Sequence, residues 1–239
     1  MILTRQRPSR RPATLVGLAL AGLALTGCGA SLGIHPGSAV VVGDRTASMQ
    51  HVDSTSSLYC KAYLPTIQQQ SSGGSIPMRY IRQFVAASMT ERLIGEQLAE
   101  QYGVTPASGY AQHQAQVQQQ FSQLPQDQLN AVLDVEGGDP YLQNVQVAVG
   151  QQLTGNSGEA TADIKHAQQR GLVATQDWLN AHTVAVDPAL GVAIKDGKVT
   201  GVRDQTSYPV SALAVSGAQN TGQADPSYTA ALTPSQLCG

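Results

Sequence analysis

The chain contains 239 residues with a formal net charge of −2, and only 13% of the residues are charged. Nucleic-acid binding requires clustered basic side chains that neutralise phosphates, so an acidic chain with few basic residues is not expected to bind nucleic acids. The same shortage of lysine and arginine excludes a basic surface that would attract anionic lipid headgroups.

The first 27 residues have the organisation of a bacterial secretory signal peptide. An apolar run over residues 13–25 follows four arginines, namely Arg5, Arg7, Arg10 and Arg11. That run is shorter than the roughly 20 apolar residues that a membrane-spanning helix needs. It ends in Leu25-Thr26-Gly27-Cys28, the pattern of a lipoprotein cleavage site, in which small residues fit the peptidase and the cysteine thiol carries diacylglycerol. We therefore predict a signal peptide over 1–27 and lipidation of Cys28. An ordinary signal peptide with a chance cysteine, or an uncleaved anchor, is the alternative.

Lipidation would determine where the protein is found. Two acyl chains anchor a protein stably, because each buried methylene group contributes about 0.8 kcal/mol. We predict that the processed chain stays on the extracytoplasmic face of the cell membrane, attached through lipid alone. Residues 28–38, rich in Gly and Ser, are predicted to form a flexible tether. Loss of the signal arginines leaves ten basic and sixteen acidic residues, a net charge of −6.

The three cysteines divide into one lipid carrier and one pair. If Cys28 carries lipid, Cys60 and Cys238 remain as an even number in an oxidising compartment. We predict a disulfide between them, which would join the beginning of the folded domain to its last residues. Two unpaired thiols are the alternative. Neither cysteine has a His or acidic partner in a known nucleophile pattern, so a catalytic thiol is not expected.

Apolar periodicity predicts a helical bundle. Residues 39–43 form a short apolar run typical of a strand, and 52–64 is ambiguous, with Asp53 as a possible cap of a short helix. Residues 68–75 are predicted to be a loop. The clearest helix begins at Pro77 and stops at Gly103, with one apolar stripe: Tyr80, Ile81, Phe84, Val85, Met89, Leu93, Leu98 and Tyr102. Further helices are predicted over about 105–124, from Pro125, from Asp139-Pro140, and over about 159–181, where Gly171 could weaken the middle.

After Ala181 the pattern changes to short strands. Val184 and Val186, then Val192 and Ile194, alternate with polar neighbours, and Asp196-Gly197 predicts a hairpin turn before Val199. The fold class predicted is therefore mainly α. A bundle of about five helices, with short strands from both terminal segments, forms a domain over 39–202. Residues 203–239 are predicted to be an extended low-complexity tail held by Cys238.

No motif predicts catalysis or metal binding. The five histidines lack zinc-ligand spacing, and no serine-nucleophile elbow, phosphate loop or dinucleotide glycine pattern occurs. Residues 135–139 bring Glu136 and Asp139 close together in a loop, which we interpret as a turn with helix caps. We predict no catalytic residue, no metal and no cofactor.

Three segments follow one another in an informative order. The first is Ala39-Val40-Val41-Val42-Gly43-Asp44, the second Ala99-Glu100-Gln101-Tyr102-Gly103-Val104-Thr105-Pro106, and the third Val184-Ala185-Val186-Asp187-Pro188-Ala189-Leu190-Gly191. Together they resemble the SurA N-terminal chaperone family, especially its short bacterial lipoproteins without a parvulin isomerase domain. The resemblance covers residues 39–195. Val42 replaces the Asn that is usual in that family, and Ala189-Leu190 stand where Arg-Tyr is common.

The resemblance implies binding of unfolded or newly exported polypeptides by apolar grooves between helices, without enzymatic activity. The candidate client-binding residues are aromatic: Tyr80, Phe84, Tyr110, Phe121 and Trp178. A closed bundle that binds no client is also compatible with the amphipathic pattern. Two further functions remain as alternatives, a structural or partner-binding envelope lipoprotein and a peptidyl-prolyl isomerase, although no parvulin-like stretch of αβ pattern is found.

Overall fold

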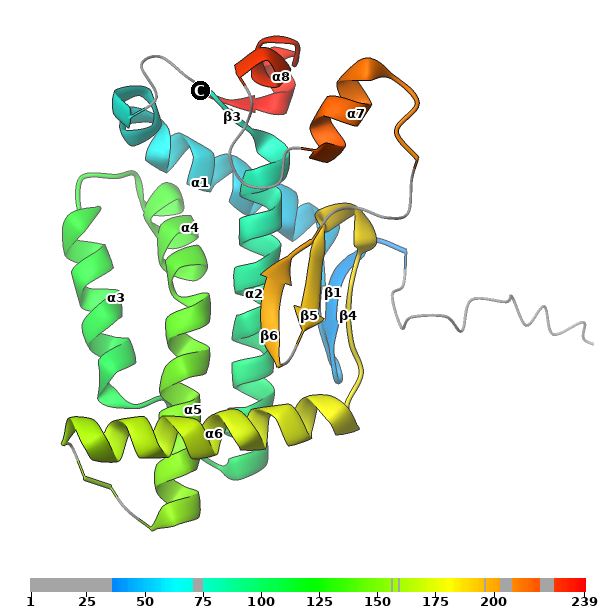
Figure 1. Cartoon of the computed structure of the whole chain (residues 1–239). Helices are drawn as coiled ribbons and strands as arrows, with labels where there is room; N and C mark the ends of the chain where they lie inside the picture. The colour runs from blue at the N-terminus through cyan, green and yellow to red at the C-terminus, as the bar shows by residue number, and fades with distance from the viewer. Residues whose placement is uncertain are drawn as a thin grey trace, which may run out of the picture. The chain divides into compact units, whose positions relative to one another are not determined.

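Six helices form the body of the molecule (Figure 1). They are α1 (Met49–Gln70), α2 (Met78–Tyr102), α3 (Ser108–Gln120), α4 (Gln126–Glu136), α5 (Gly138–Thr154) and α6 (Thr161–Ala181). The structure, a computed structural model, describes residues 36–70, 75–155, 157–158, 160–195, 197–202, 208–219 and 226–239. The predicted mainly α fold with short strands is confirmed. Cys28, the predicted signal peptide and most of the predicted tether lie outside the described residues.

Helix α2 runs through the centre and contacts α1, α4, α5 and β1. Of its predicted apolar stripe, Ile81, Val85 and Leu98 are buried, whereas Phe84 is 47% exposed and the other members are half-buried. Gly103 ends the helix in the left-handed conformation, at φ 63°, a region that favours glycine. Its N–H and that of Val104 donate to the carbonyl groups of Glu100 and Ala99, at 3.2 and 3.0 Å. The predicted stop at Gly103 is confirmed.

Helix α1 is longer than the short element predicted over 52–64, and it includes the first residues of the loop predicted over 68–75. Its cap is Ser48, whose Oγ accepts from the N–H of His51 at 3.1 Å, rather than Asp53, whose carboxylate pairs with Arg82 at 2.7 Å. Its buried face contains polar residues, Thr55 at 5% exposure and Ser56 at 0%, beside apolar ones. This mixture weakened the apolar periodicity on which the prediction relied.

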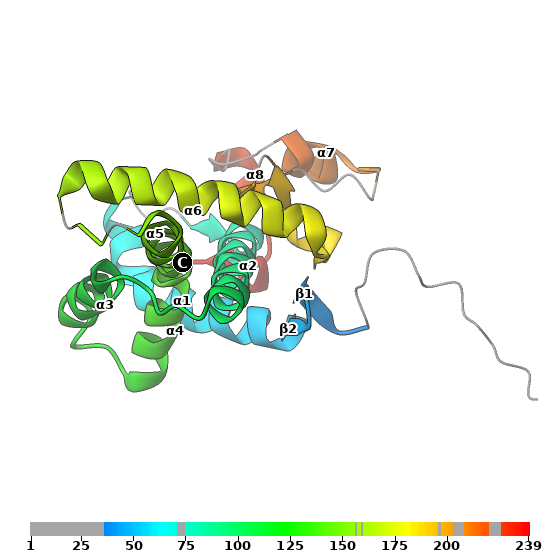
Figure 2. The ribbon, with the colours of Figure 1, turned by 90° about the horizontal axis from the view of Figure 1, so that it is seen from below.

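Helix α6 crosses α5 at very short range (Figures 1 and 2). A Cβ at Gly150 of α5 would overlap the carbonyl group of Ala167 of α6, and a Cβ at Gly171 of α6 would overlap that of Gln146 of α5. Gly171 therefore does not weaken α6, which is continuous. It allows the two backbones to approach each other.

The described strands bring distant parts of the chain together. β1 (Ser38–Val42) pairs antiparallel with β2 (Arg45–Ser48) on one side and with β4 (Val184–Val186) on the other, so the two ends of the bundle share one sheet. β5 (Val192–Lys195) and β6 (Lys198–Gly201) form the predicted hairpin, with Gly197 at φ 74° in its turn; Asp196 lies outside the described residues. β3 (Ile76–Pro77) pairs with β7 (Leu237–Cys238).

The prediction of an extended tail over 203–239 is wrong for much of its described part. Residues 212–219 form α7 (Ala212–Gln219) and residues 226–230 form α8 (Pro226–Ala230). Ser211 Oγ accepts from the N–H of Ala214 at 3.1 Å and caps α7, and Tyr228 of α8 is buried. Alanine in α7 favours a helix without producing apolar periodicity, so composition alone suggested an unstructured segment.

Candidate functional site

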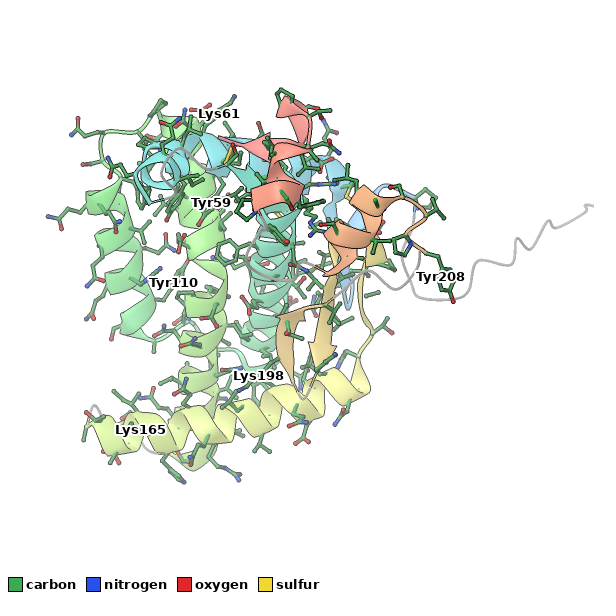
Figure 3. The ribbon with its side chains drawn as sticks, turned by 45° about the horizontal axis from the view of Figure 1, so that its top comes forward. Tyr59, Lys61, Tyr110, Lys165, Lys198 and Tyr208 are labelled. Carbon is green, nitrogen blue, oxygen red and sulfur yellow. A yellow bond between two sulfur atoms is a disulfide. The ribbon has the colours of Figure 1, made fainter. Side chains whose placement is uncertain are left out.

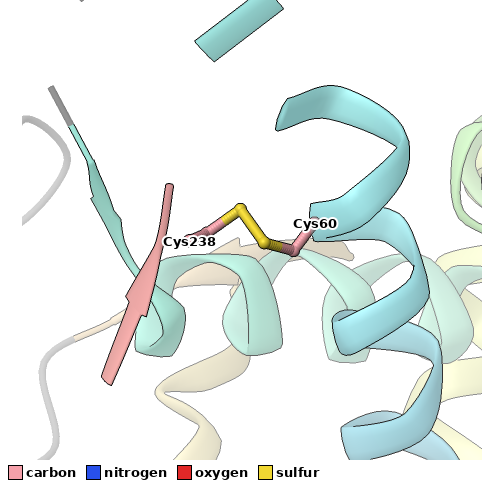
Figure 4. Close-up of a disulfide and its surroundings, with 2 residues drawn as sticks. All are labelled: Cys60 and Cys238. Carbon is pink, nitrogen blue, oxygen red and sulfur yellow. A yellow bond between two sulfur atoms is a disulfide. The ribbon is translucent and has the colours of Figure 1, made fainter. Parts of the chain in front are cut away.

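A disulfide joins Cys60 of α1 to Cys238 of β7 (Figure 4), with Cα atoms 5.7 Å apart. This is the pairing that the cysteine count predicts. The bond fixes the end of the chain beside α1, and β7 in turn pairs with β3, which leads directly into α2. The tail is therefore attached to the two helices that carry the aromatic residues described next.

Four rings meet where α1 faces α2 and the end of α3, and we call them the aromatic cluster: Tyr59, Tyr63, Phe84 and Phe121. Ring centroids are 4.5 Å apart for Tyr59 and Tyr63, 5.8 Å for Tyr59 and Phe84, and 5.2 Å for Tyr63 and Phe121. These separations are those of favourable aromatic pairs. Tyr59 is buried, Tyr63 and Phe121 are half-buried, and Phe84 is 47% exposed. The cluster therefore extends from the core to the surface.

Glu136, the last residue of α4, lies against this cluster. The hydroxyl groups of Tyr59 and Tyr63 both donate to its Oε1, the second at 2.8 Å. Burial, and then the nearby Glu136 carboxylate, raise the pKa of Tyr63 to about 12 and that of Tyr59 further. Both phenols therefore remain hydrogen-bond donors at neutral pH. His113 Nε2 lies 2.9 Å from the backbone oxygen of Glu136 and thus contacts the helix end rather than the carboxylate.

Two of the five predicted client-binding residues, Phe84 and Phe121, belong to the aromatic cluster, at the two ends of its chain of ring contacts. Trp178 is 3% exposed and stacks on the ring of His182, with centroids 4.3 Å apart, so it lies in the core and not on an accessible surface. Tyr80 is half-buried, and its hydroxyl accepts a hydrogen bond from Arg79 at 2.7 Å.

Tyr110, the fifth of these residues, belongs to an internal network. It points from α3 towards α5 (Figure 3), where its ring packs edge-on against Tyr141. The guanidinium of Arg92 lies over both rings, 3.9 Å from the Tyr141 centroid and 5.7 Å from that of Tyr110. Arg92 also pairs with Glu96 at 2.8 Å, and Glu96 pairs with Arg45 at the same distance. This network connects α2, α3, α5 and β2.

Other apolar side chains are exposed near the crossing of α5 and α6. The exposed fraction is 53% for Val173, and Leu153, Ile164 and Leu172 are exposed as well. A separate group lies on the tail, comprising Tyr208, whose ring extends away from the bundle (Figure 3), and Val210, Leu213 and Val215. These positions were not predicted as site residues.

A shallow cavity of about 410 Å³ lies between the C-terminal end of α6 and the β5–β6 hairpin. Its lining is largely polar and consists of Gln176, Leu179, Asn180, His182, Val184, Ile194 and Gly197. None of the predicted client-binding residues contributes to it.

The prediction of two carboxylates in a loop over 135–139 also needs correction. Glu136 ends α4 and Asp139 lies in the first turn of α5, so the two helices are nearly continuous. The charge of Asp139 instead acts on the pKa of Glu91, a residue of α2. Burial, reinforced by the Asp139 charge, raises the pKa of Glu91 to about 7. In the described part of the chain, no group of His, Cys, Asp or Glu side chains is arranged to hold a metal ion. None of the described helices has the length and apolar character needed to cross a membrane.

Sequence reasoning missed Tyr59, Tyr63 and Glu136. The spacing of the two tyrosines places them one turn apart on any helix, so recognition of α1 would have revealed that face. No comparable signal exists for Glu136, since 77 residues separate it from Tyr59. Comparison with known proteins adds no assignment: no family model, no curated protein and no solved structure matches the chain.

Proposed function

We propose that this protein is a membrane-tethered extracytoplasmic lipoprotein that acts as a non-enzymatic chaperone or foldase accessory. In this proposal it binds unfolded exported polypeptides through exposed apolar side chains. The observation that carries the proposal is the aromatic cluster that reaches the surface at Phe84, together with the exposed apolar residues of α6. Exposed apolar groups of this kind suit transient contact with the apolar segments of an extended client.

Two features of the sequence support the same proposal. The signal peptide and Cys28 would place the bundle among newly exported chains. The order of strand, long helix, further helices and returning strand is the order on which the resemblance to the SurA N-terminal family rests, and β1 and β4 pair in the structure. Docking of one fixed envelope partner on α6 is the second candidate, since Leu172 and Val173 are both exposed there.

An aggregation assay tests the proposed function. The protein should suppress light scattering by an unfolded exported client at stoichiometric amounts. Combined substitution Leu172→Ser and Val173→Ser should weaken suppression, because it removes apolar contact area without touching the core. Gln169→Ser, an exposed change on the same helix, is the matched control. No suppression by the parent protein would argue strongly against chaperone activity.

Crosslinking in cells separates the two candidates. A chaperone should capture many exported chains, whereas a protein that docks a fixed partner should capture one. Anchoring is tested separately with Cys28→Ala, which should abolish lipid attachment and retention at the membrane, with Ser31→Ala as the control. A proline-limited refolding assay should show no catalytic turnover, because the proposed activity is binding alone.

A further inference from the structure

The Glu136 carboxylate has no cationic partner among the described residues. The ion pairs in this part of the chain connect Arg45, Arg82 and Arg92 with other carboxylates, those of Glu96, Glu100 and Asp53. Glu136 receives two phenol hydroxyls, and both donate to the same oxygen, Oε1. Within the described structure, no hydrogen bond reaches Oε2.

Solvent reaches this carboxylate beside the aromatic cluster. Glu136, Tyr63 and Phe121 are each half-buried, and Phe84 is the most exposed of the four rings. A cation that approached Oε2 would therefore meet a partly desolvated negative charge and aromatic rings together. Cations are attracted both to ring faces and to carboxylates, and more strongly where water is partly excluded.

The protein contains the same chemistry in a completed form. Around Arg92, two tyrosine rings and the Glu96 carboxylate hold a guanidinium that the chain itself supplies. Around Glu136, two tyrosine rings and a carboxylate are present, but the described residues supply no cation. The clusters differ in this positive group and in the tyrosine hydroxyls: that of Tyr110 accepts from Arg92, whereas those of Tyr59 and Tyr63 donate to Glu136.

We propose that the Glu136 carboxylate and the aromatic cluster form a binding site for a basic side chain, preferably arginine, of a bound polypeptide. Arginine is preferred to lysine because its planar guanidinium stacks on aromatic rings while one of its N–H groups donates to Oε2. Phe84 and Phe121 would contact the apolar residues that flank the basic one. The inference rests on the proposed function, since it names a feature of the clients, but binding of a short peptide tests it without any folding assay.

The test is a titration of the full chain in detergent with two short, acetylated and amidated peptides, observed through the tyrosine ring resonances. One peptide carries arginine, and the other carries citrulline, which has nearly the same shape and no charge. The arginine peptide should bind about tenfold more tightly than the citrulline peptide and should shift the Tyr63 ring resonances. Equal binding of the two peptides, or binding that leaves the Tyr63 resonances unchanged, would overturn the proposal.

The substitution Glu136→Gln tests whether the charge of Glu136 causes the preference for the arginine peptide. It keeps an oxygen that can accept from the tyrosine hydroxyls, so the fold should persist, and the preference for arginine should disappear. Asp127→Asn, the same charge change at an exposed position of α4, is the control and should leave that preference intact. An equal loss in both variants would indicate long-range attraction instead of a site and would overturn the proposal. If arginine binding holds while aggregation suppression fails, the site stands and the chaperone function does not.

Discussion

The crossing of α5 and α6 gives the most direct test of the helix arrangement, through Gly150→Ala. In an exposed helix this change stabilises by about 1 kcal/mol, because alanine loses less conformational entropy than glycine. In α5 the added Cβ would lie 2.8 Å from the Cα of Ala167 in α6 and would overlap its carbonyl group. The obstacle is backbone, so no side-chain rotation can relieve the overlap.

The size of the effect follows from the required movement. Carbon atoms are in favourable contact at about 3.5–4.0 Å, so the helices would have to separate by roughly 1 Å along their crossing. Overpacking of this kind costs about 1–3 kcal/mol. Toward the upper end of that range the cost exceeds the gain in helix propensity, and we expect a net loss of about 2 kcal/mol in the free energy of unfolding.

Urea unfolding with the disulfide intact measures this loss as a lower midpoint at unchanged slope. Gly171→Ala should behave in the same way, since its Cβ would meet the backbone of Gln146. Gly109→Ala is the matched control: the atoms nearest its Cβ belong to the Asn144 side chain, which can rotate at the cost of its hydrogen bond to the Pro140 carbonyl. A Gly150→Ala protein as stable as the parent would refute the helix crossing described here.

Changes at three other groups should alter stability in distinguishable ways. Cys238→Ser removes a bond that spans 178 residues and should lower the free energy of unfolding by up to about 5 kcal/mol; free thiols in a non-reduced peptide digest of the parent would contradict the pairing. The folded state raises the pKa of Tyr63 to about 12, so the free energy of unfolding should fall as pH rises from about 10 to about 12. The fall should be smaller in Tyr63→Phe. An equal fall in the parent and in the variant over this pH range would refute the prediction. Folding raises the pKa of Glu91 to about 7, so stability should be lost as pH rises from about 4.5 to about 7. The free energy of unfolding of Glu91→Gln should therefore exceed that of the parent at pH ~8 and not at pH ~4. A difference that does not depend on pH would refute the raised pKa as its cause.

The elements that sequence reasoning predicted well are those whose apolar residues recur at helical spacing and whose ends carry a clear stop signal. Helix α2 has an apolar stripe at this spacing and a glycine at its end, so both its existence and its stop were predictable. Strands β1 and β4 and the β5–β6 hairpin were also predictable, because valine-rich runs and an Asp-Gly pair stand outside the helical period; β2, β3 and β7 were not predicted. Helices α1 and α7 were missed or shortened, since one buries Thr55 and Ser56 and the other consists largely of small residues.

The candidate site was only partly predictable, because its members are selected by tertiary contacts. Phe84 and Trp178 have equivalent positions in the apolar patterns of their helices, yet Phe84 reaches solvent and Trp178 is in the core. Close approach of α6 and α5 through Gly150 and Gly171 accompanies the burial of α6, whereas the Phe84 ring of α2 packs against Tyr59 and stays 47% exposed. A single sequence contains no information on which face of a helix remains uncovered.

The same reasoning explains why the two tyrosine–carboxylate clusters could not be told apart from the sequence. Arg92 and Glu96 are four residues apart on α2, so their pairing follows from helix geometry, and only the positions of Tyr110 and Tyr141 depend on packing. Glu136 and its two tyrosines come from α4 and α1, which contact each other only in the folded bundle. A local pair provides its own cation, whereas a carboxylate positioned by tertiary packing receives one only if the fold places a basic residue beside it. Among the described residues no basic side chain pairs with Glu136, so this carboxylate, unlike that of Glu96, is open to a charged client residue.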